Sequence, residues 1–152
     1  MTRVVEMLQA ALAAEHATVY CYGAAGAGLR GSAQETARIV MNAHRARRDE
    51  LAETLTRRGA RPVAAEAAYR LPVRVTSEET AAELAAVLEE RLVAVYLGLV
   101  GVDDPELRRY AALAMQEAAG RAAGWREAAG SAVTSPAFPG LPPSALGPRP
   151  GR

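Results

Sequence analysis

The sequence predicts an all-α fold, a four-helix bundle whose second and third helices are joined by one long crossover. Half of the 152 residues are hydrophobic, but the chain has only one Phe and one Trp and is rich in alanine. Such a composition favours helices that approach closely and fits a sheet core poorly. Apolar residues also recur at three- and four-residue steps along four long segments. The unequal connections between these segments predict an up-down-down-up order.

A chain of 152 residues has the size of a single domain with its own core. We predict that residues 1–130 form the bundle and that residues 131–152 form a Pro/Gly-rich C-terminal tail. The tail sequence SPAFPGLPPSALGPRPGR has too many prolines for a helix. Its aromatic residue, Phe138, is a candidate to dock on the bundle.

The first helix is predicted from about Arg3 to about Leu29. Glu15 lies at its middle within an otherwise apolar stripe, whereas His16 is turned roughly 100° away from that stripe. The stripe consists of Val4, Leu8, Leu12, Glu15, Val19 and Tyr22.

The second helix is predicted between Ser32 and Gly59. Ser32 and Glu35 have the spacing of a capping box, and Gly59 is a typical C-terminal stop. His44 interrupts the apolar stripe at the middle of this helix, as Glu15 does in the first helix. Arg48 falls on the same stripe as His44. The inward face consists of Ala37, Val40, His44, Leu51 and Leu55.

Residues 60–76 form the longest internal connection, with prolines at positions 62 and 72. A second helix of about 27 residues is about 40 Å long, and some 17 extended residues at about 3.3 Å each can run that full length. Tight hairpins need far fewer residues. A long second connection between short first and third ones is therefore typical of a bundle with one crossover, as against simple up-down-up-down order.

The third helix is predicted to begin at Thr76 or Ser77, with Glu79 completing a capping box, and to end near Gly101. Glu89 lies at the edge of the apolar stripe of this helix. The main stripe consists of Leu84, Leu88, Leu92, Val95 and Leu99.

The fourth helix is predicted to begin at Asp104, which is followed by a proline in the first turn, and to end near Gly130. The turn before it is short, so the third and fourth helices should be antiparallel neighbours. Glu117 and Arg121 lie at the edge of its inward face. That face consists of Leu107, Ala111, Ala114, Ala118, Ala122 and Trp125.

Each helix thus carries a titratable residue near its middle: Glu15, His44, Glu89 and Glu117. A di-iron bundle places a lone Glu on two helices and a Glu-x-x-His pair on the other two, because carboxylates and imidazoles suit iron or manganese. Here Met41 stands three residues before His44, where the pair requires a Glu. Gly120 stands three residues after Glu117, where the pair requires a His, so neither pair is complete. One hypothesis is a degraded metal site for iron or manganese, formed by these four residues.

The other hypothesis is an interior network without metal. Arg48 and Arg121 lie one helical turn beyond His44 and Glu117. An arginine fork satisfies a buried carboxylate in the absence of any cation. We favour this metal-free network, which joins both arginines to the four titratable residues, and we therefore expect no cofactor.

Composition narrows the classes of function. The formal net charge of +1 gives no general attraction to nucleic acid or to acidic membranes, so neither is an expected partner. The longest uncharged run, residues 128–148, is rich in Pro, Gly and Ser and is not a membrane span. A single cysteine, Cys21, excludes an internal disulfide, and the first residues lack a signal-peptide pattern. We predict a cytoplasmic protein.

Several segments have a distinctive sequence, namely AAEHATVYCYG, AHRARRDEL, YRLPV, the helix of Trp125 and PAFPG. They resemble a family of alanine-rich ferritin-like domains of unknown function in actinobacteria, over about Val4 to Gly140. The resemblance implies a ferritin-like bundle that forms a dimer. It supplies no activity and no catalytic residue, and the lack of both Glu-x-x-His pairs distinguishes the chain from ferritin-like metalloproteins.

We predict an uncharacterised ferritin-like protein with a degenerate metal site, acting as a homodimeric, non-catalytic binding or interaction protein. The first alternative is a metal-binding oxidase or peroxide-handling protein that uses Glu15, His44, Glu89 and Glu117. The second alternative is a nucleoid-type miniferritin that binds DNA through the arginines of the second helix.

Overall fold

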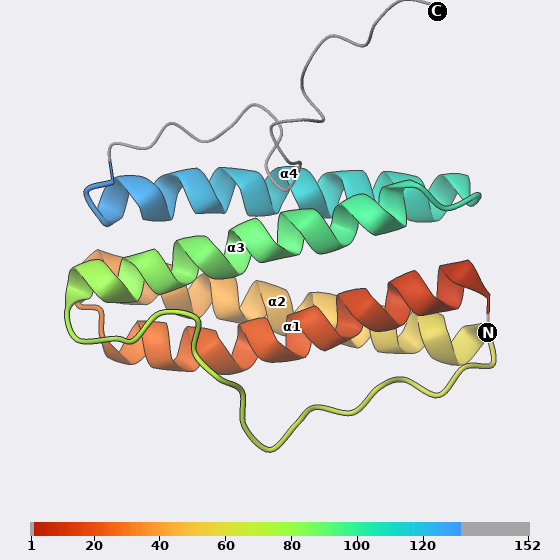
Figure 1. The fold of residues 1–152 in the computed structure, drawn as a ribbon, viewed down its shortest axis with the longest axis horizontal. Coiled ribbons are helices and arrows are strands. Elements are labelled where there is room, and N and C mark those ends of the chain that lie inside the picture. Colours follow the sequence, from red (N-terminus) through yellow and green to blue (C-terminus); the bar gives the residue numbers. More distant parts are fainter. Residues whose placement is uncertain (1, 132–152) are drawn as a thin grey trace, which may run out of the picture.

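The computed structural model describes residues 2–131, and over that range the chain forms four helices and no strand. The helices are α1 (Arg3–Ala27), α2 (Gly31–Arg57), α3 (Glu78–Val100) and α4 (Pro105–Ala128). Figure 1 shows that α2 returns antiparallel to α1, that α3 runs in the same direction as α2, and that α4 is antiparallel to α3. The predicted four-helix bundle with up-down-down-up order is confirmed. Phe138 and the predicted tail from residue 132 onward lie outside the described residues.

The crossover between α2 and α3 runs along the length of the bundle (Figure 1) and is held by polar side chains of α1. Gln9 donates from Nε2 to the carbonyl of Arg61 at 2.7 Å and accepts from the amide of Val63 at 2.8 Å. Nε2 of His16 lies 3.0 Å from the carbonyl of Val63. These bonds satisfy backbone groups that have no partner in a strand or helix.

The N-terminus of α2 differs from the prediction. The N-cap residue is Arg30, which makes no side-chain cap, and the helix begins at Gly31 rather than after Ser32. Glu35 pairs with Arg38 one turn along the exposed surface, so it does not close a capping box. At the other end, Gly59 has a φ of +75° just beyond the helix, as expected for a C-terminal stop.

The predicted capping box of α3 is misplaced by one residue. Ser77 is the N-cap, so the position that reaches back to it is Thr80 and not Glu79. Oγ of Ser77 accepts from the Thr80 amide at 3.1 Å, and Oγ1 of Thr80 accepts from the Ser77 amide at 2.9 Å. The predicted cap of α4 is confirmed, because Asp104 accepts from two backbone amides of the first turn.

The inward faces match the periodicity of the sequence. All five residues predicted for the inner face of α2 are buried, as are all six predicted for α4. The buried hydrophobic residues form two clusters, one around Leu8, Leu55 and Leu99 and the other around Leu84 and Trp125. Polar residues buried near the middles of the helices therefore have hydrophobic packing towards both ends of the bundle.

The four sides of the bundle are not equally closed. α1 packs against α2 and α3, and α3 packs against α4, whereas no Cα atoms of α2 and α4 lie within 8 Å of each other. Long side chains bridge this fourth side instead, in the ion pairs Arg47–Glu117 and Arg58–Asp104. Over residues 2–131, none of the helices is long and apolar enough to cross a membrane.

Gly28 follows α1 at a point where the crossover leaves no room for a side chain. A Cβ there would come within 2.5 Å of Val75 Cγ1 and within 3.0 Å of Ala81 Cβ. We expect Gly28→Ala to lower the free energy of unfolding by about 1–3 kcal/mol, because the end of the crossover must shift. Denaturant unfolding would measure this loss.

The matched control is Gly23→Ala, where nothing lies within 4 Å of an added Cβ. Alanine inside a helix should raise the free energy of unfolding by roughly 0.5–1 kcal/mol relative to glycine. Effects of the same sign at both positions would contradict the packing of the crossover against the end of α1.

Candidate functional site

The centre of the bundle contains a polar cluster formed by Glu15 of α1, His44 of α2 and Glu89 of α3. Nδ1 of His44 lies 2.7 Å from Oε2 of Glu15, and Nε2 lies 2.8 Å from Oε1 of Glu89. The exposed fraction is 2% for His44 and 0% for each glutamate. The imidazole ring therefore lies between two buried carboxylates, with one ring nitrogen directed at each.

This arrangement stabilises the protonated form of His44. Burial disfavours the imidazolium, but the hydrogen bonds and negative charges of Glu15 and Glu89 outweigh that cost and raise the pKa of His44 to about 9. Both ring nitrogens then donate to carboxylate oxygens. At neutral pH the cluster thus holds an internal cation shared by two acids.

Two buried tyrosines complete the cluster. Tyr22 donates to Oε1 of Glu89 and Tyr96 donates to Oε1 of Glu15, each at 2.6 Å. Nε1 of Trp125 donates in turn to the Tyr22 oxygen at 3.0 Å. Burial and the adjacent carboxylate raise the pKa of both phenols, so they remain neutral hydrogen-bond donors.

The tyrosines and glutamates form a reciprocal pattern between α1 and α3. Each helix carries a glutamate followed seven residues later by a tyrosine: Glu15 and Tyr22 in α1, and Glu89 and Tyr96 in α3. Seven residues are about two helical turns, so both side chains share one face. Each tyrosine bonds the glutamate of the other helix. Helical periodicity alone places Tyr22 in the stripe of α1 and does not distinguish it from a packing residue, whereas the repeated Glu-x6-Tyr spacing is a signal that identifies both tyrosines.

The two carboxylates are not held equally. Glu15 receives Tyr96 on one oxygen and His44 on the other. On Glu89, both donors converge on Oε1, and Oε2 is buried without a hydrogen-bond partner among the described residues. Because an unsatisfied buried oxygen is costly, Glu89 is the less stabilised acid of the pair.

The other predicted site residues lie outside the buried cluster. The side chain of Glu117 is 50% exposed and pairs with Arg47 at 2.7 Å, and Arg121 lies 3.9 Å from the same carboxylate. Arg48 pairs with the neighbouring Asp49. The structure thus brings together three residues of the predicted interior network and places Glu117, Arg48 and Arg121 nearer the surface.

Arg47, not Arg48, packs against the aromatic rings beside the cluster. Its Cζ lies 5.0 Å from the ring centroid of Tyr110 and 5.9 Å from that of Tyr96, within range of cation–π attraction. Its guanidinium also donates to Glu117 across the open side of the bundle. Arg47 therefore links α2 and α4 beside the buried cluster.

Comparison with known proteins places the chain in a family. Residues 7–143 match the model of a domain of unknown function, DUF4439. The chain belongs to the DUF4439 family. It is similar to a conserved hypothetical protein, rv2844, from Mycobacterium tuberculosis, whose crystal structure matches with 32% identity and a TM-score of 0.79, covering 82% of this chain and 96% of that one. No curated protein matches the chain.

The buried cluster of this DUF4439 chain does not fit a metal centre as it stands. Both nitrogens of His44 are directed at carboxylates, so neither is free to ligate an ion. Glu117, the fourth predicted ligand, faces Arg47 instead. Within residues 2–131, no three His, Cys, Asp or Glu side chains are placed to hold a metal together.

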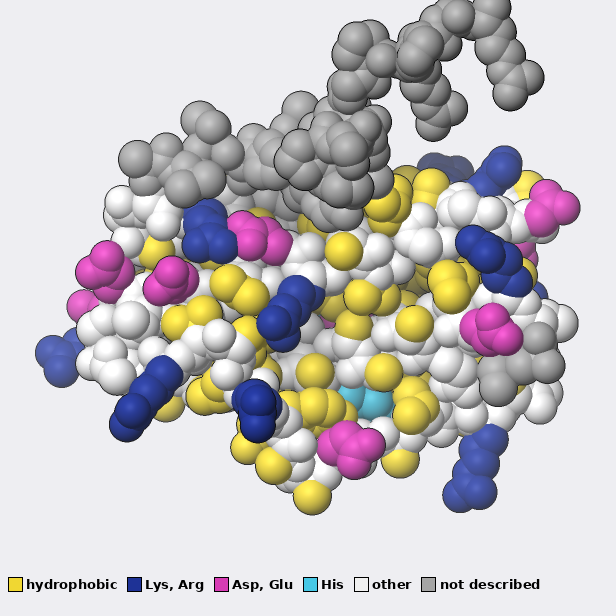
Figure 2. Space-filling model, in the orientation of Figure 1, with side chains coloured by type: hydrophobic (Ala, Val, Ile, Leu, Met, Phe, Trp, Pro, Cys, Tyr) yellow, Lys and Arg dark blue, Asp and Glu magenta, His cyan; other side chains and the backbone are white. Residues whose placement is uncertain are grey.

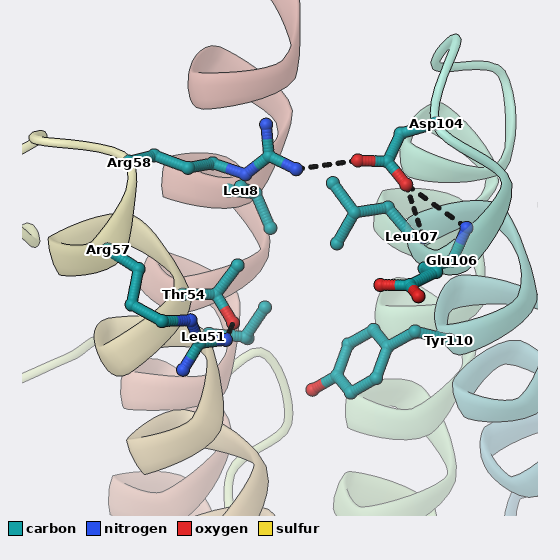
Figure 3. Close-up of a pocket in the computed structure, with 9 residues that line it drawn as sticks. All are labelled: Leu8, Leu51, Thr54, Arg57, Arg58, Asp104, Glu106, Leu107 and Tyr110. Atoms are coloured by element: carbon teal, nitrogen blue, oxygen red, sulfur yellow. Dashed lines mark hydrogen bonds and ion pairs between the residues drawn. The ribbon is translucent and has the colours of Figure 1, made fainter.

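A pocket of about 430 Å³ opens between α2 and α4 of the DUF4439 bundle (Figure 3). Arg58 and Asp104 form an ion pair across it, with Nη2 and Oδ2 2.6 Å apart. Tyr110 contributes to the lining and packs edge-on against Tyr96, with ring centroids 6.4 Å apart. The pocket is thus separated from the buried cluster by aromatic rings, and its position is set by the open side of the bundle.

Removing one phenol oxygen tests the hydrogen bonds of the cluster. Tyr22→Phe removes one of the two donors to Glu89 and leaves Trp125 without its acceptor, so we expect a loss of about 2–3 kcal/mol in the free energy of unfolding. Tyr96→Phe removes only the bond to Glu15 and should cost about 1–2 kcal/mol. Urea unfolding of both variants measures the difference.

Tyr69→Phe provides the control, because within residues 2–131 the hydrogen bond of the Tyr69 hydroxyl is one accepted from an exposed backbone amide of the crossover. Its effect should stay below about 1 kcal/mol. If all three variants lost the same amount, the buried hydrogen bonds would not be distinguished from ordinary surface contacts.

Proposed function

We propose that this DUF4439 protein is a non-catalytic binding protein with a ferritin-like bundle, in which a protonated Glu–His–Glu cluster stands where related bundles hold metal. The observation that carries the proposal is the position of His44. Its ring lies between Glu15 and Glu89, with both nitrogens within hydrogen-bond distance of a carboxylate. The imidazolium thus provides the positive charge that a cation provides in a metalloprotein.

The chemistry of the cluster favours a structural role. Buried carboxylates are costly unless they are paired, and here each has a cationic partner and a phenol donor. The raised pKa values of Tyr22 and Tyr96 keep these groups neutral, and burial separates the cluster from substrate. The cluster ties α1, α2 and α3 together, which leaves the surface of the bundle for binding.

Metal content tests this proposal. The protein would be expressed without an affinity tag in medium supplemented with iron and manganese, and the metal per chain measured by mass spectrometry. We expect far less than one metal per chain in a well-folded helical protein. Stoichiometric metal that is lost in Glu15→Ala and His44→Ala, but retained in His16→Ala, would overturn the proposal.

A metal-binding oxidase is the second candidate, favoured by one observation. Glu15, His44 and Glu89 are an imidazole and two carboxylates from three helices at the same level of the bundle, which are the donor types that iron and manganese prefer. In this candidate, His44 loses its proton and turns a nitrogen to the metal. Oxygen-dependent loss of Fe(II) that disappears in His44→Ala would support it.

We also propose that the protein is a cytoplasmic homodimer. Ile39 of α2 and Leu113 of α4 are large hydrophobic side chains with exposed fractions of 56% and 51%. Contact with a second copy would remove such surface from water. Sedimentation of the wild-type chain and of an Ile39→Glu variant would test this, and a wild-type monomer at micromolar concentration would refute it.

A further inference from the structure

A second cavity, of about 470 Å³, lies between α1, α3 and the crossover. This side of the bundle is opposite the open side between α2 and α4. Its wall is mostly apolar and includes Cys21 of α1 and Leu88, Leu92 and Val95 of α3. The volume and the apolar lining are typical of small-molecule binding sites.

Two arginines line the same cavity, Arg70 of the crossover and Arg91 of α3. Within residues 2–131, neither one takes part in an ion pair. Both arginines of the pocket in Figure 3, by contrast, have carboxylate partners. The second cavity therefore combines an apolar wall with two positive charges that the described chain does not neutralise.

The positive charge of Arg91 acts on Cys21, which lies in the apolar wall of the cavity. Burial raises the pKa of the Cys21 thiol, and the positive charge of Arg91 opposes that rise. Figure 2 shows that the surface around the cavity is also both apolar and basic. Hydrophobic side chains gather over α1, α3 and the crossover, with separate basic side chains among them. An anionic group at this cavity would thus meet positive charge beside apolar surface.

The crossover wall of the cavity is held in place before any ligand binds. Tyr69 lines the cavity, its ring packs against Tyr20 with centroids 5.5 Å apart, and its hydroxyl accepts from the Glu66 amide at 2.8 Å. A preformed site loses less conformational entropy when a ligand binds. The cavity is therefore built from fixed walls and not from a loop that must first fold.

We propose that this cavity binds a small amphipathic anion, with its apolar body against α1 and α3 and its terminal carboxylate or phosphate between Arg70 and Arg91. The inference rests on the binding role proposed above and names its class of ligand. Burial of the apolar body supplies affinity, and the guanidinium groups select an anion over a neutral molecule of the same shape.

Calorimetric titration of the full chain with three probes tests the ligand class. The probes are decanoate, decyl phosphate and decanol, which share a chain length and differ in their polar group. We expect at least one anion to bind saturably, and decanol to bind at least about tenfold more weakly. The tighter anion identifies the preferred group. Equal binding of decanol, or no saturable binding of either anion, would overturn the inference.

Paired variants test the location. Arg70→Ala and Arg91→Ala should each weaken binding of the preferred anion about tenfold, whereas Arg74→Ala, in the crossover but outside the cavity lining, should not. Ala94→Leu should block binding by filling the cavity, and Ala123→Leu, on the exposed surface of α4, should not. Wild-type affinity in both arginine variants and in Ala94→Leu would place the ligand elsewhere and refute the proposed site.

Metal analysis of the same protein preparation separates the two proposals. Metal-free protein that binds neither anion would overturn this inference and leave the proposed non-catalytic cluster intact. Stoichiometric metal together with anion binding at Arg70 and Arg91 would overturn the non-catalytic role and leave the ligand site intact.

Discussion

Replacing His44 with alanine should lower the free energy of unfolding by about 3–5 kcal/mol at pH 7. The variant leaves the buried carboxylates of Glu15 and Glu89 without the cation that they share. Two facing carboxylates in a common buried site then repel each other with no cation between them. Denaturant unfolding at pH 7 measures the loss.

His16→Ala is the matched control for this experiment. His16 is the other histidine of the chain, and it makes one hydrogen bond to the crossover carbonyl of Val63. Its replacement should cost about 1 kcal/mol or less at pH 7. A second variant, His44→Ala combined with Glu89→Gln, should recover part of the stability because one of the two facing charges is gone. Equal losses in the two histidine variants would contradict the shared-cation model.

The wild-type protein should lose on the order of 3 kcal/mol of unfolding free energy as the pH rises from about 6.5 to about 9. The pKa of His44 is raised from its ordinary 6.5 to about 9 in the folded state. Between these values the folded chain keeps a proton that the unfolded chain releases. The stabilisation is therefore complete below the unfolded pKa and is lost as the pH passes through the folded pKa.

Unfolding midpoints across this pH range, together with an NMR titration of the His44 ring, measure the effect. His44→Gln has no titrating ring and should show a much flatter profile, whereas His16→Ala should keep the wild-type slope. A wild-type profile that is flat from pH 6.5 to 9, or a His44 ring that titrates near its ordinary pKa, is the outcome that would falsify the model of a buried imidazolium.

The positions of the helices and their inward faces could be predicted because they depend on local sequence. Apolar residues at helical steps must share a face, and a bundle buries that face. The same periodicity placed Glu15, His44 and Glu89 inside the stripes or at their edge, and all three are buried. The capping box of α3 was misplaced because Thr76 and Ser77 are both capping residues, and a one-residue change of N-cap moves the box from Glu79 to Thr80.

The choice among the arginines could not be made from spacing. Arg47 and Arg48 lie three and four residues after His44, so on the helix surface one lies about 60° to one side of His44 and the other about 40° to the other side. Which of the two arginines packs beside the cluster depends on which side of α2 has no helix packed against it. The separation of α2 from α4 leaves room for Arg47 to reach Glu117, and that contact accounts for the outward position of Glu117.

By itself, the sequence determined the four helices, their order, the long crossover and the burial of three titratable residues, because helical period and connection length are properties of the chain alone. Only the tertiary structure decided how those residues are used. It placed His44 between Glu15 and Glu89, paired each glutamate with the tyrosine of the other helix, and left Glu117 at the surface. Hydrogen bonds between helices depend on distances and rotations that no single helix contains.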